Sequence, residues 1–369
     1  MKIGNYDFGK ETLHSLFMDF LDSVRVNLRG IPKLSGENPT EIATQVIKAN
    51  AKNVFYAGTG HFRFMWVSDF AKALAGSKKV LSPSYVRKMI DYMIKESYKR
   101  RHVTNCFTAK RGFDMPFYRA DNLPWLIHAI KEYFDWTKDE KLLSGNRKEL
   151  QWLIDSYEST HFKNDLISTS IRGDWMDTLI RPSSTYTNIC ALNMLKHIEK
   201  LGLKSKIDSS SLEKNILNSR WRENYFTDYS GTEKMGVDAC VIALYFNLFN
   251  KNIRHAIIER LESSKITKNI LIKVTNQYYH KKLLSSFLIN VNYHSSIWLH
   301  MGLMYLNGLK KNGIDISVHK DRMDKLIMKF KNIVEVVDKL GKPYKTFFHS
   351  SEYGLSMGAG QYLEMSELI

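Results

Sequence analysis

The chain has 369 residues, of which 44% are hydrophobic and 25% are charged, and its formal net charge is +16 at pH 7. This composition excludes a disordered tail and supplies enough apolar material for a large core. No stretch approaches the roughly 18 consecutive apolar residues of a membrane span, and the first residues lack the apolar segment and cleavage site of a signal peptide. We therefore expect a cytoplasmic protein with no membrane partner.

The positive charge is spread along the chain. Basic residues alternate with apolar ones in segments such as RKMIDYMIKESYKRR, and the longest basic runs have only three residues. A solvated basic surface explains this pattern better than a nucleic-acid site does.

No cofactor or metal site is indicated by the sequence. The three cysteines, Cys106, Cys190 and Cys240, are far apart and lack C-x-x-C spacing, so we expect reduced thiols. There is no Gly-rich phosphate loop and no H-E-x-x-H motif, and the histidines are scattered.

Apolar residues recur with a period of 3.6 residues along most of the chain, which is typical of helices. After the start signal Ser-Pro-Ser at 82–84, one helical face carries Val86, Met89, Ile90, Met93 and Ile94. In chain order, the same pattern predicts further helices at about 10–28, 39–51, 66–76, 121–136, 146–158, 186–201, 209–220, 236–249, 253–263, 293–310, 318–338 and 356–367.

The connections between these helices differ in length. Five long ones hold many of the aromatic, glycine and acidic residues: 52–65, 101–120, 159–185, 264–292 and 339–355. Loops of this length are rare in compact domains unless they are functional. Since no Pro-, Ser- or Gly-rich linker divides the chain, we expect one all-α domain over residues 1–369. It would be an (α/α) barrel whose long loops build a site at one end.

The stretch GDWMD at 173–177 lies in one of these long connections. One interpretation is a helix cap or a turn, which Asp and Gly both favour. The other is chemical, because an indole offers a stacking surface for a sugar ring. An apolar neighbour also raises the pKa of a carboxyl group, as a general acid at neutral pH requires.

Two glutamates near the C-terminus are further acidic candidates. Glu335 lies near the end of the helix predicted at 318–338, where the alternative interpretation is an ion pair with Lys331 or Lys339. Glu352 lies in SSEYGLSMGAGQYL, whose small residues allow close approach to a ligand or another helix.

Five segments in sequence order, over residues 55–369, resemble motifs of the (α/α)6-barrel glycoside hydrolases. This group includes glucoamylases, trehalases, processing α-glucosidases and the amylo-α-1,6-glucosidase domain of glycogen debranching enzymes. FRFMWVSDFAKALAG is similar to their W-x-R-D segment and RADNLPWLIHAI to the D-x-x-x-W helix start. GDWMDTLIRPSSTYTNICALNML resembles T-W-M-D…E-I-N-A-L, and NYHSSIWLHMGLMYLNGL resembles Y-H-x-x-x-V-W. EVVDKLGKP…YGLSMGAGQYLEM resembles E-x-x-D-x-x-T-G-x-P…W-S-x-A.

The resemblance implies an (α/α)6 toroid, also called a six-hairpin barrel, and an inverting, exo-acting α-glucosidase. Its substrates would be oligosaccharides or glycogen-like glucans. Asp177 would be the general acid and Glu335 the ionised general base, with Glu352 as the fallback base. In such enzymes the two carboxyl groups lie about 6.5–9.5 Å apart. Asp69 would hold hydroxyls of the terminal sugar.

Further residues would bind the sugar in the same pocket: Trp66, Arg63, Asp121, Trp125, Trp175, Asp174, His294 and Trp298. We expect the four tryptophans to form an aromatic wall, with packing in the core as the alternative. Asp174 falls where the debranching pattern has no acid, so we expect it to serve the loop.

Some positions depart from the family pattern. Ser68 replaces its arginine, which Arg63 or Arg119 would have to supply, and Asn188 and Cys190 replace the Glu and Asn of E-I-N-A-L. These departures keep other functions open, namely sugar phosphorolysis, hydrolysis of another sugar, and a non-catalytic helical binding protein. The sequence does not fix the oligomeric state.

Overall fold

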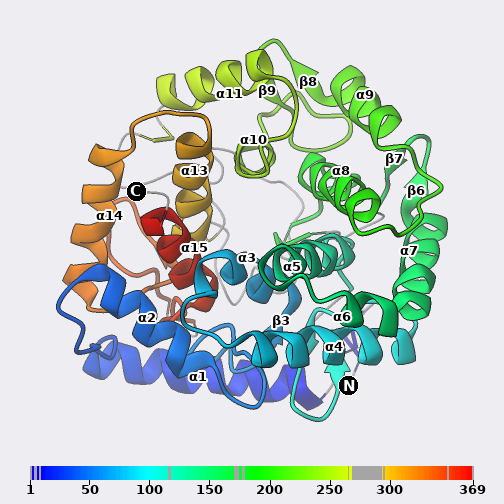
Figure 1. Cartoon of the computed structure of the whole chain (residues 1–369). Helices are drawn as coiled ribbons and strands as arrows, with labels where there is room; N and C mark the ends of the chain where they lie inside the picture. Colours follow the sequence, from blue (N-terminus) through cyan, green and yellow to red (C-terminus); the bar gives the residue numbers. More distant parts are fainter. Residues whose placement is uncertain are drawn as a thin grey trace.

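The computed structural model describes residues 2–3, 6–7, 10–114, 118–169, 174–176, 179–264, 266–267, 293, 296–346 and 349–367. Six helices form an inner ring: α3 (Val67–Ser77), α5 (Asn122–Thr137), α8 (Thr185–Lys200), α10 (Val237–Tyr245), α13 (Leu299–Lys311) and α15 (Ser356–Glu367). Each packs against the next in this order, and α15 packs against α3, so the ring is closed (Figure 1). This confirms the expected all-α (α/α)6 toroid.

An outer layer of helices surrounds the ring: α2 (Pro39–Asn50), α4 (Pro83–Arg100), α7 (Arg147–His161), α9 (Ser209–Arg220), α11 (Lys251–Ser263) and α14 (Ser317–Phe330) (Figure 1). Inner and outer helices alternate along the chain. Two more helices lie outside this alternation, α1 (Lys10–Arg29) and the short α6 (Glu140–Gly145). None of the described helices has the length and apolar character needed to cross a membrane.

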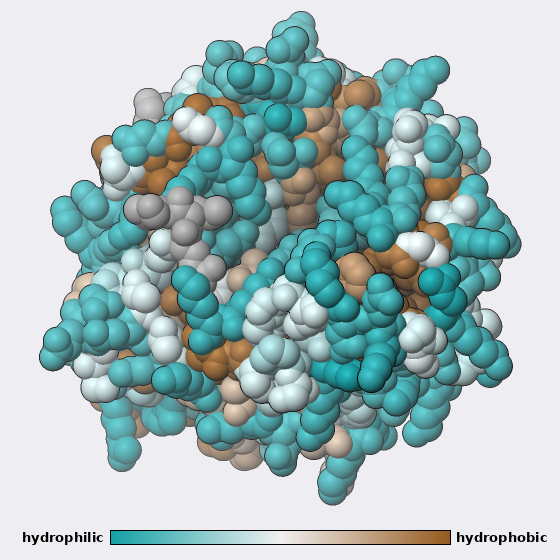
Figure 2. Space-filling view, viewed as in Figure 1, coloured by the Kyte–Doolittle hydropathy of each residue, from teal (hydrophilic) through white to brown (hydrophobic). Residues whose placement is uncertain are grey.

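Burial explains which helices line the ring. All nine residues of α10, VDACVIALY, are buried, so this helix is apolar around its whole circumference. The outer helix α4 instead buries one stripe, the one predicted from Val86 to Ile94, and exposes its lysines and arginines. In the view of Figure 1 the surface is accordingly mostly hydrophilic, and hydrophobic side chains show mainly in the recesses between helices (Figure 2).

Glycine allows the ring to close between α3 and α15. A Cβ atom on Gly76 would lie 2.0 Å from the Gly360 carbonyl oxygen, and one on Gly360 would lie 2.2 Å from the Ala73 carbonyl oxygen. Only glycine permits this approach of two helix backbones.

The long connections all lead from an outer helix to the next inner one, whereas the reverse connections are short. Since the inner helices run parallel to one another, the long connections gather at the end of the toroid where those helices begin. The described parts of the long connections therefore share one end, as predicted, while residues 268–292 lie outside the described residues.

Two-residue antiparallel strands hold these loops together. Between different loops, β3 (Met65–Trp66) pairs with β4 (Cys106–Phe107), and β10 (Ile297–Trp298) pairs with β11 (Val336–Val337). The other pairs are local: β4 with β5 (Gly112–Phe113), β1 (Lys2–Ile3) with β2 (Tyr6–Asp7), β6 (Phe162–Lys163) with β7 (Leu166–Ile167), and β8 (Trp221–Arg222) with β9 (Tyr225–Phe226).

Three predicted helices are shorter than expected. The one predicted at 318–338 ends at Phe330, because Lys331 adopts a left-handed conformation with φ of 50° and the β-branched Val336 and Val337 pair as a strand. The helix predicted at 293–310 begins at Leu299, after extended Trp298, and that predicted at 236–249 ends at Tyr245. Glu335 therefore lies in a loop beside β11 and not in a helix. The assignment of residues 1–369 to a single domain stays a prediction.

Candidate functional site

The predicted site residues gather where the inner helices begin. Asp69 is in the first turn of α3, Asp121 is the N-cap residue of α5, and Trp298 precedes α13. Glu335 and Glu352 lie in the connection that leads to α15. Because helix N-termini carry partial positive charge, this end of the toroid favours carboxylates and anionic groups.

Glu335 is a buried carboxyl group with few hydrogen bonds. The Tyr293 hydroxyl donates to its Oε2 over 2.8 Å, and the Glu352 backbone N–H lies 3.4 Å from the same oxygen. Burial raises the pKa of Glu335 to about 8, although Tyr293 and His61 act to lower it. We expected an ionised base, whereas this pKa favours the protonated form at neutral pH.

Glu352 is a fully buried carboxylate that is saturated with donors. Its two oxygens accept from the backbone N–H groups of Gly60, His61 and Phe62 at 2.6–2.9 Å. The Tyr353 N–H adds a fourth contact at 3.2 Å. A carboxylate held this way fixes the loop at 58–62 and has little capacity left to activate water.

The glycines of this loop are needed for that contact. A Cβ atom on Gly58 or Gly60 would lie 2.5 Å from the Glu352 side chain. Gly354 has a φ of +61°, and a Cβ there would lie 2.2 Å from Thr59 Oγ1. The small residues noted in the sequence around Glu352 therefore accommodate the chain's own backbone and side chains.

A second group of charges surrounds Asp69. Arg119 forms a bidentate pair with Asp121, with distances of 3.1 Å and 2.9 Å, and lies 6.0 Å from the ring centroid of Trp66. Burial raises the pKa of Asp69, while Lys72 and Arg119 act to lower it. Arg119 thus brings a buried guanidinium close to Asp69. The other candidate, Arg63, is exposed and donates to Gly60 within its own loop.

The tryptophans divide into a contacting pair and two separate residues. The rings of Trp175 and Trp298 meet edge to face at 5.0 Å, and Tyr293 packs on Trp298 at 4.7 Å. Trp125 donates to the Tyr186 hydroxyl and has the Lys72 ammonium 5.0 Å from its ring centroid, whereas Trp66 packs near Phe62. All four are buried. A common aromatic wall of these four residues stays a prediction.

A continuous series of contacts nevertheless links these residues around one end of the toroid. Starting at Glu335, it passes through Tyr293, Trp298, Trp175, Tyr186 and Trp125 to Lys72. On the other side, it passes from Glu335 through Glu352 and Phe62 to Trp66 and Arg119. The structure therefore places most of the predicted residues at one end of the toroid, and a common pocket stays a prediction.

Asp174 belongs to a buried ionic network. Arg181 contacts Asp174 at 2.8 Å, Asp228 at 2.7 Å and Asp238 at 2.9 Å, and Trp175 Nε1 donates to Asp238 over 2.9 Å. Asp174 also accepts from the Met176 N–H. The network anchors the described part of the loop, 174–176, to α10, which agrees with a role for Asp174 in the loop.

Asp177 and His294 lie outside the described residues, so their roles and the separation of Asp177 from Glu335 stay predictions. Three neighbours were not proposed from the sequence: Tyr293, Lys72 and Arg181. Tyr293 stands at the Tyr of Y-H-x-x-x-V-W, so its signal was present. Lys72 and Arg181 carried no sequence signal, because burial of a cation depends on the folded ring.

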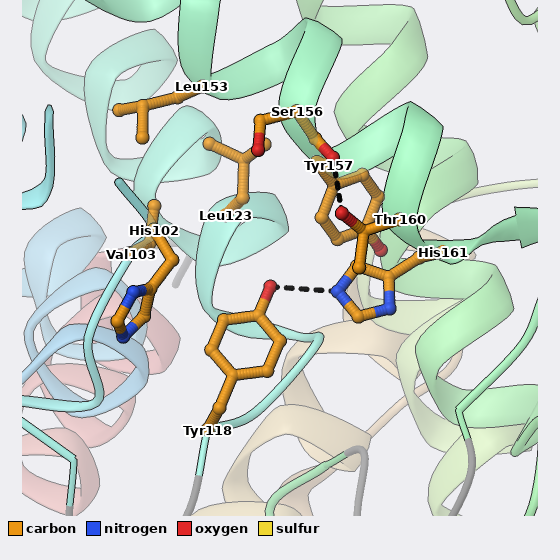
Figure 3. Close-up of a pocket in the computed structure, with 9 residues that line it drawn as sticks. All are labelled: His102, Val103, Tyr118, Leu123, Leu153, Ser156, Tyr157, Thr160 and His161. Atoms are coloured by element: carbon orange, nitrogen blue, oxygen red, sulfur yellow. Dashed lines mark hydrogen bonds between the residues drawn. The ribbon is translucent and has the colours of Figure 1, made fainter. Parts of the chain in front are cut away.

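A separate pocket of about 110 Å³ lies between α5, α7 and the connection that follows α4 (Figure 3). It is lined by His102, Val103, Tyr118, Leu123, Leu153, Ser156, Tyr157, Thr160 and His161, and the Tyr118 hydroxyl lies 2.9 Å from His161 Nε2. Its lining contains no carboxylate. None of the predicted site residues lines it, so it offers no acid–base pair.

Comparison with solved structures relates the ring to known proteins. A glycosidase in complex with glucose matches with a TM-score of 0.67 and 12% identity, covering 89% of this chain and 95% of that chain. A rhamnosidase from Klebsiella oxytoca with rhamnose bound matches with a TM-score of 0.65 and 10% identity, covering 90% of this chain and 64% of that one. A bacterial glucoamylase complexed with acarbose gives 0.62 and 12%, covering 89% of this chain and 55% of that one.

The chain has the fold of these glycosidases. No protein-family model matches the sequence, and no curated protein matches it. At 10–12% identity the likeness concerns the fold, so the activity has to be argued from the side chains.

Proposed function

We propose that this protein is an inverting glycoside hydrolase that removes sugar units from the ends of α-linked oligosaccharides or glycogen-like glucans. The observation that carries the proposal is Glu335. Its carboxyl group is buried where the inner helices begin, bonded to Tyr293 and close to the Trp175–Trp298 pair. It belongs to a helical ring with the same fold as three glycosidases of known structure.

In this mechanism Glu335, when ionised, takes a proton from the attacking water. Asp177 donates a proton to the leaving oxygen from the other side of the sugar. Glu352 is the less suitable base because backbone N–H groups already occupy its oxygens. We assign it the role of holding the loop at 58–62 in place.

Binding of the terminal sugar falls to Asp69 and the groups around it. Asp69 accepts hydrogen bonds from sugar hydroxyls. Ser68 stands where the family pattern has an arginine, and we assign the role of that arginine to the buried guanidinium of Arg119. The Trp175–Trp298 pair offers apolar surface to a sugar ring. The oligosaccharide partner and the cytoplasmic location belong to this proposal.

The test is a panel of α-linked gluco-oligosaccharides and α-rhamnosides, incubated with the full chain with and without inorganic phosphate. Release of free glucose without phosphate supports the proposal. Release of rhamnose alone would show that the substrate is a rhamnoside. Formation of a sugar phosphate only when phosphate is present would indicate phosphorolysis. No turnover of any substrate in the panel would contradict the enzyme proposal.

Two variants test the assigned residues. Asp177→Asn and Glu335→Gln should each reduce turnover by roughly 10²–10⁴-fold, the contribution of one proton-transfer partner. Glu259→Gln is the matched control, because Glu259 is exposed on the outer helix α11. Full activity in Glu335→Gln would remove this residue from the mechanism.

A further inference from the structure

Beside Glu352, a cluster of buried polar groups remains that the proposed hydrolysis does not use. It consists of Asp19 of α1, His61 and His349, and we call it the Asp19–His61–His349 cluster. One possible metal-ligating atom from each residue lies within 4.8 Å of the other two. The histidine side chains are 1% and 4% exposed, and that of Asp19 is 13% exposed.

The hydrogen bonding of this cluster is incomplete within the described part of the chain. His349 Nδ1 lies 2.7 Å from Asp19 Oδ2, which accounts for one pair. His61 Nδ1 lies 3.1 Å from Glu352 Oε2, without the alignment of a hydrogen bond, and 3.6 Å from Asp19 Oδ1, which is too long for one. His61 Nε2, His349 Nε2 and Asp19 Oδ1 are also buried without a hydrogen-bond partner.

Buried imidazole nitrogens without hydrogen bonds are costly, so their retention calls for a ligand. We propose that the Asp19–His61–His349 cluster binds one divalent transition-metal ion, with Zn²⁺ as the best match. Two imidazoles and one carboxylate are a common zinc ligand set, whereas Ca²⁺ and Mg²⁺ prefer oxygen ligands. The fourth position would be taken by water, because backbone N–H groups already occupy the oxygens of the neighbouring Glu352.

The spacing suits this ion after small side-chain movements. Bond lengths of about 2.0–2.2 Å in a tetrahedral site place ligand atoms about 3.3–3.5 Å apart. His349 Nδ1 lies 2.7 Å from Asp19 Oδ2 and His61 Nδ1 lies 3.6 Å from Asp19 Oδ1, and the three ligand atoms lie within 4.8 Å of one another, so the side chains would adjust around the ion. Four carboxyl groups act on His61, those of Asp19, Asp22, Glu335 and Glu352, and their negative charge would favour a dication, while Arg25 lies 3.4 Å from Asp22.

The ion would join three segments that are distant in sequence. Asp19 belongs to α1, His61 to the loop before α3, and His349 to the connection before α15. Two hydrogen bonds of 3.4 Å also join α1 to that connection, from Ser23 Oγ to the Thr346 carbonyl and from the Tyr353 hydroxyl to Asp22. Metal binding would therefore hold α1 against the loops that carry Glu335 and Glu352.

The experiment titrates the full chain, freed of metal with a chelator, with Zn²⁺ in competition with a chromophoric chelator. We expect one tightly bound ion per chain and a higher Tm, because a ligand that binds the folded state stabilises it. Co²⁺ should give the visible absorption of a low-symmetry site with nitrogen ligands. No substrate is needed, so the result is independent of the proposed hydrolysis.

Variants separate this site from adventitious binding. His349→Ala and the nearly isosteric Asp19→Asn each remove a proposed metal ligand. Each should weaken Zn²⁺ binding by more than roughly 10–100-fold, which is the typical effect of removing a residue that only hydrogen-bonds to a ligand. His255→Ala, on the exposed face of α11, should bind as the unaltered chain does. Circular dichroism checks that each variant is folded. Absence of stoichiometric binding, or equal affinity in a folded Asp19→Asn variant, would overturn the proposal and leave the cluster as ion pairs only.

Discussion

At the residue scale, Glu335 and Glu352 show how neighbouring carboxyl groups acquire different properties. Both are buried, and burial raises the pKa of each. Backbone N–H groups donate to both oxygens of Glu352, whereas among the described residues Glu335 has one hydroxyl donor and one long N–H contact. The group with fewer hydrogen bonds is the one that can exchange a proton with bound water.

The pH dependence of catalysis follows from this pKa. The base Glu335 must be ionised and the acid Asp177 protonated, so kcat/KM should have two limbs, one of them with a midpoint near the Glu335 pKa of about 8. Initial rates from pH 5 to 10 on a substrate that the panel identifies would measure it. The residual rate of Glu335→Gln should lack this limb. A profile with no limb near pH 8, or one whose limb near pH 8 persists in Glu335→Gln, would contradict Glu335 as the base.

Stability should depend on the same group. The ordinary pKa is 4.5, and burial raises it to about 8 in the folded state, so the folded protein prefers the protonated carboxyl. The free energy of unfolding should therefore fall as pH rises from about 4.5 to 8 because of this residue. Glu335→Gln should match the unaltered chain near pH 4 and exceed it in stability at pH 9. Urea unfolding at the two pH values measures this, and Glu259→Gln should show no such difference.

At the element scale, the loops are held by specific buried contacts. The loop at 58–62 wraps Glu352, and a Cβ on Gly60 would lie 2.5 Å from its Oε1. Gly60→Ala should therefore cost about 1–3 kcal/mol of stability and lower the activity by displacing the loop. Gly145→Ala is the control, since nothing lies within 4 Å of an added Cβ there. Equal Tm values for the two variants, measured by thermal unfolding, would argue against the loop contact.

Arg181 holds the described part of the neighbouring loop to α10 through three buried carboxylates. Arg181→Met keeps most of the side-chain volume but leaves these charges without their cation. It should cost about 3–5 kcal/mol, the typical effect of removing one partner of a buried ion pair. Denaturant unfolding measures this. Arg87→Met, which breaks a half-exposed pair with Asp139, should cost less than about 1 kcal/mol.

The elements were largely predictable from the sequence, whereas their precise ends and the contacts of the site were not. The apolar stripe of α4 and the long connections follow from local patterns that any helix or loop must show. The end of α14 at Phe330 depends on the pairing of Val336 with Trp298, across a long sequence separation. Likewise, the hydrogen bonds from the loop at 58–62 to Glu352 depend on Gly60. The Asp19–His61–His349 cluster depends on three segments that only the closed ring brings together.

At the scale of the whole molecule, closure of the inner ring is the feature on which the site depends. The ring closes where Gly360 of α15 lies against Ala73 of α3, and an added Cβ would meet backbone atoms at 2.2–2.6 Å. No side-chain rotation relieves that overlap. Gly360→Ala should therefore destabilise the protein by at least about 1–3 kcal/mol and weaken activity, because α3 and the loop before α15 carry Asp69, Glu335 and Glu352. Thermal unfolding checks this, and an unchanged Tm would contradict the closure.

The most direct test of the central claim is the anomeric form of the first sugar released. Proton NMR, recorded during the first minutes of reaction with an α-linked oligosaccharide, distinguishes the α from the β anomer before mutarotation mixes them. If Glu335 activates water on the face opposite Asp177, the β anomer should be released first. The Glu335→Gln variant should lose this signal. First release of the α anomer, or the same release by the Glu335→Gln variant, would contradict the account.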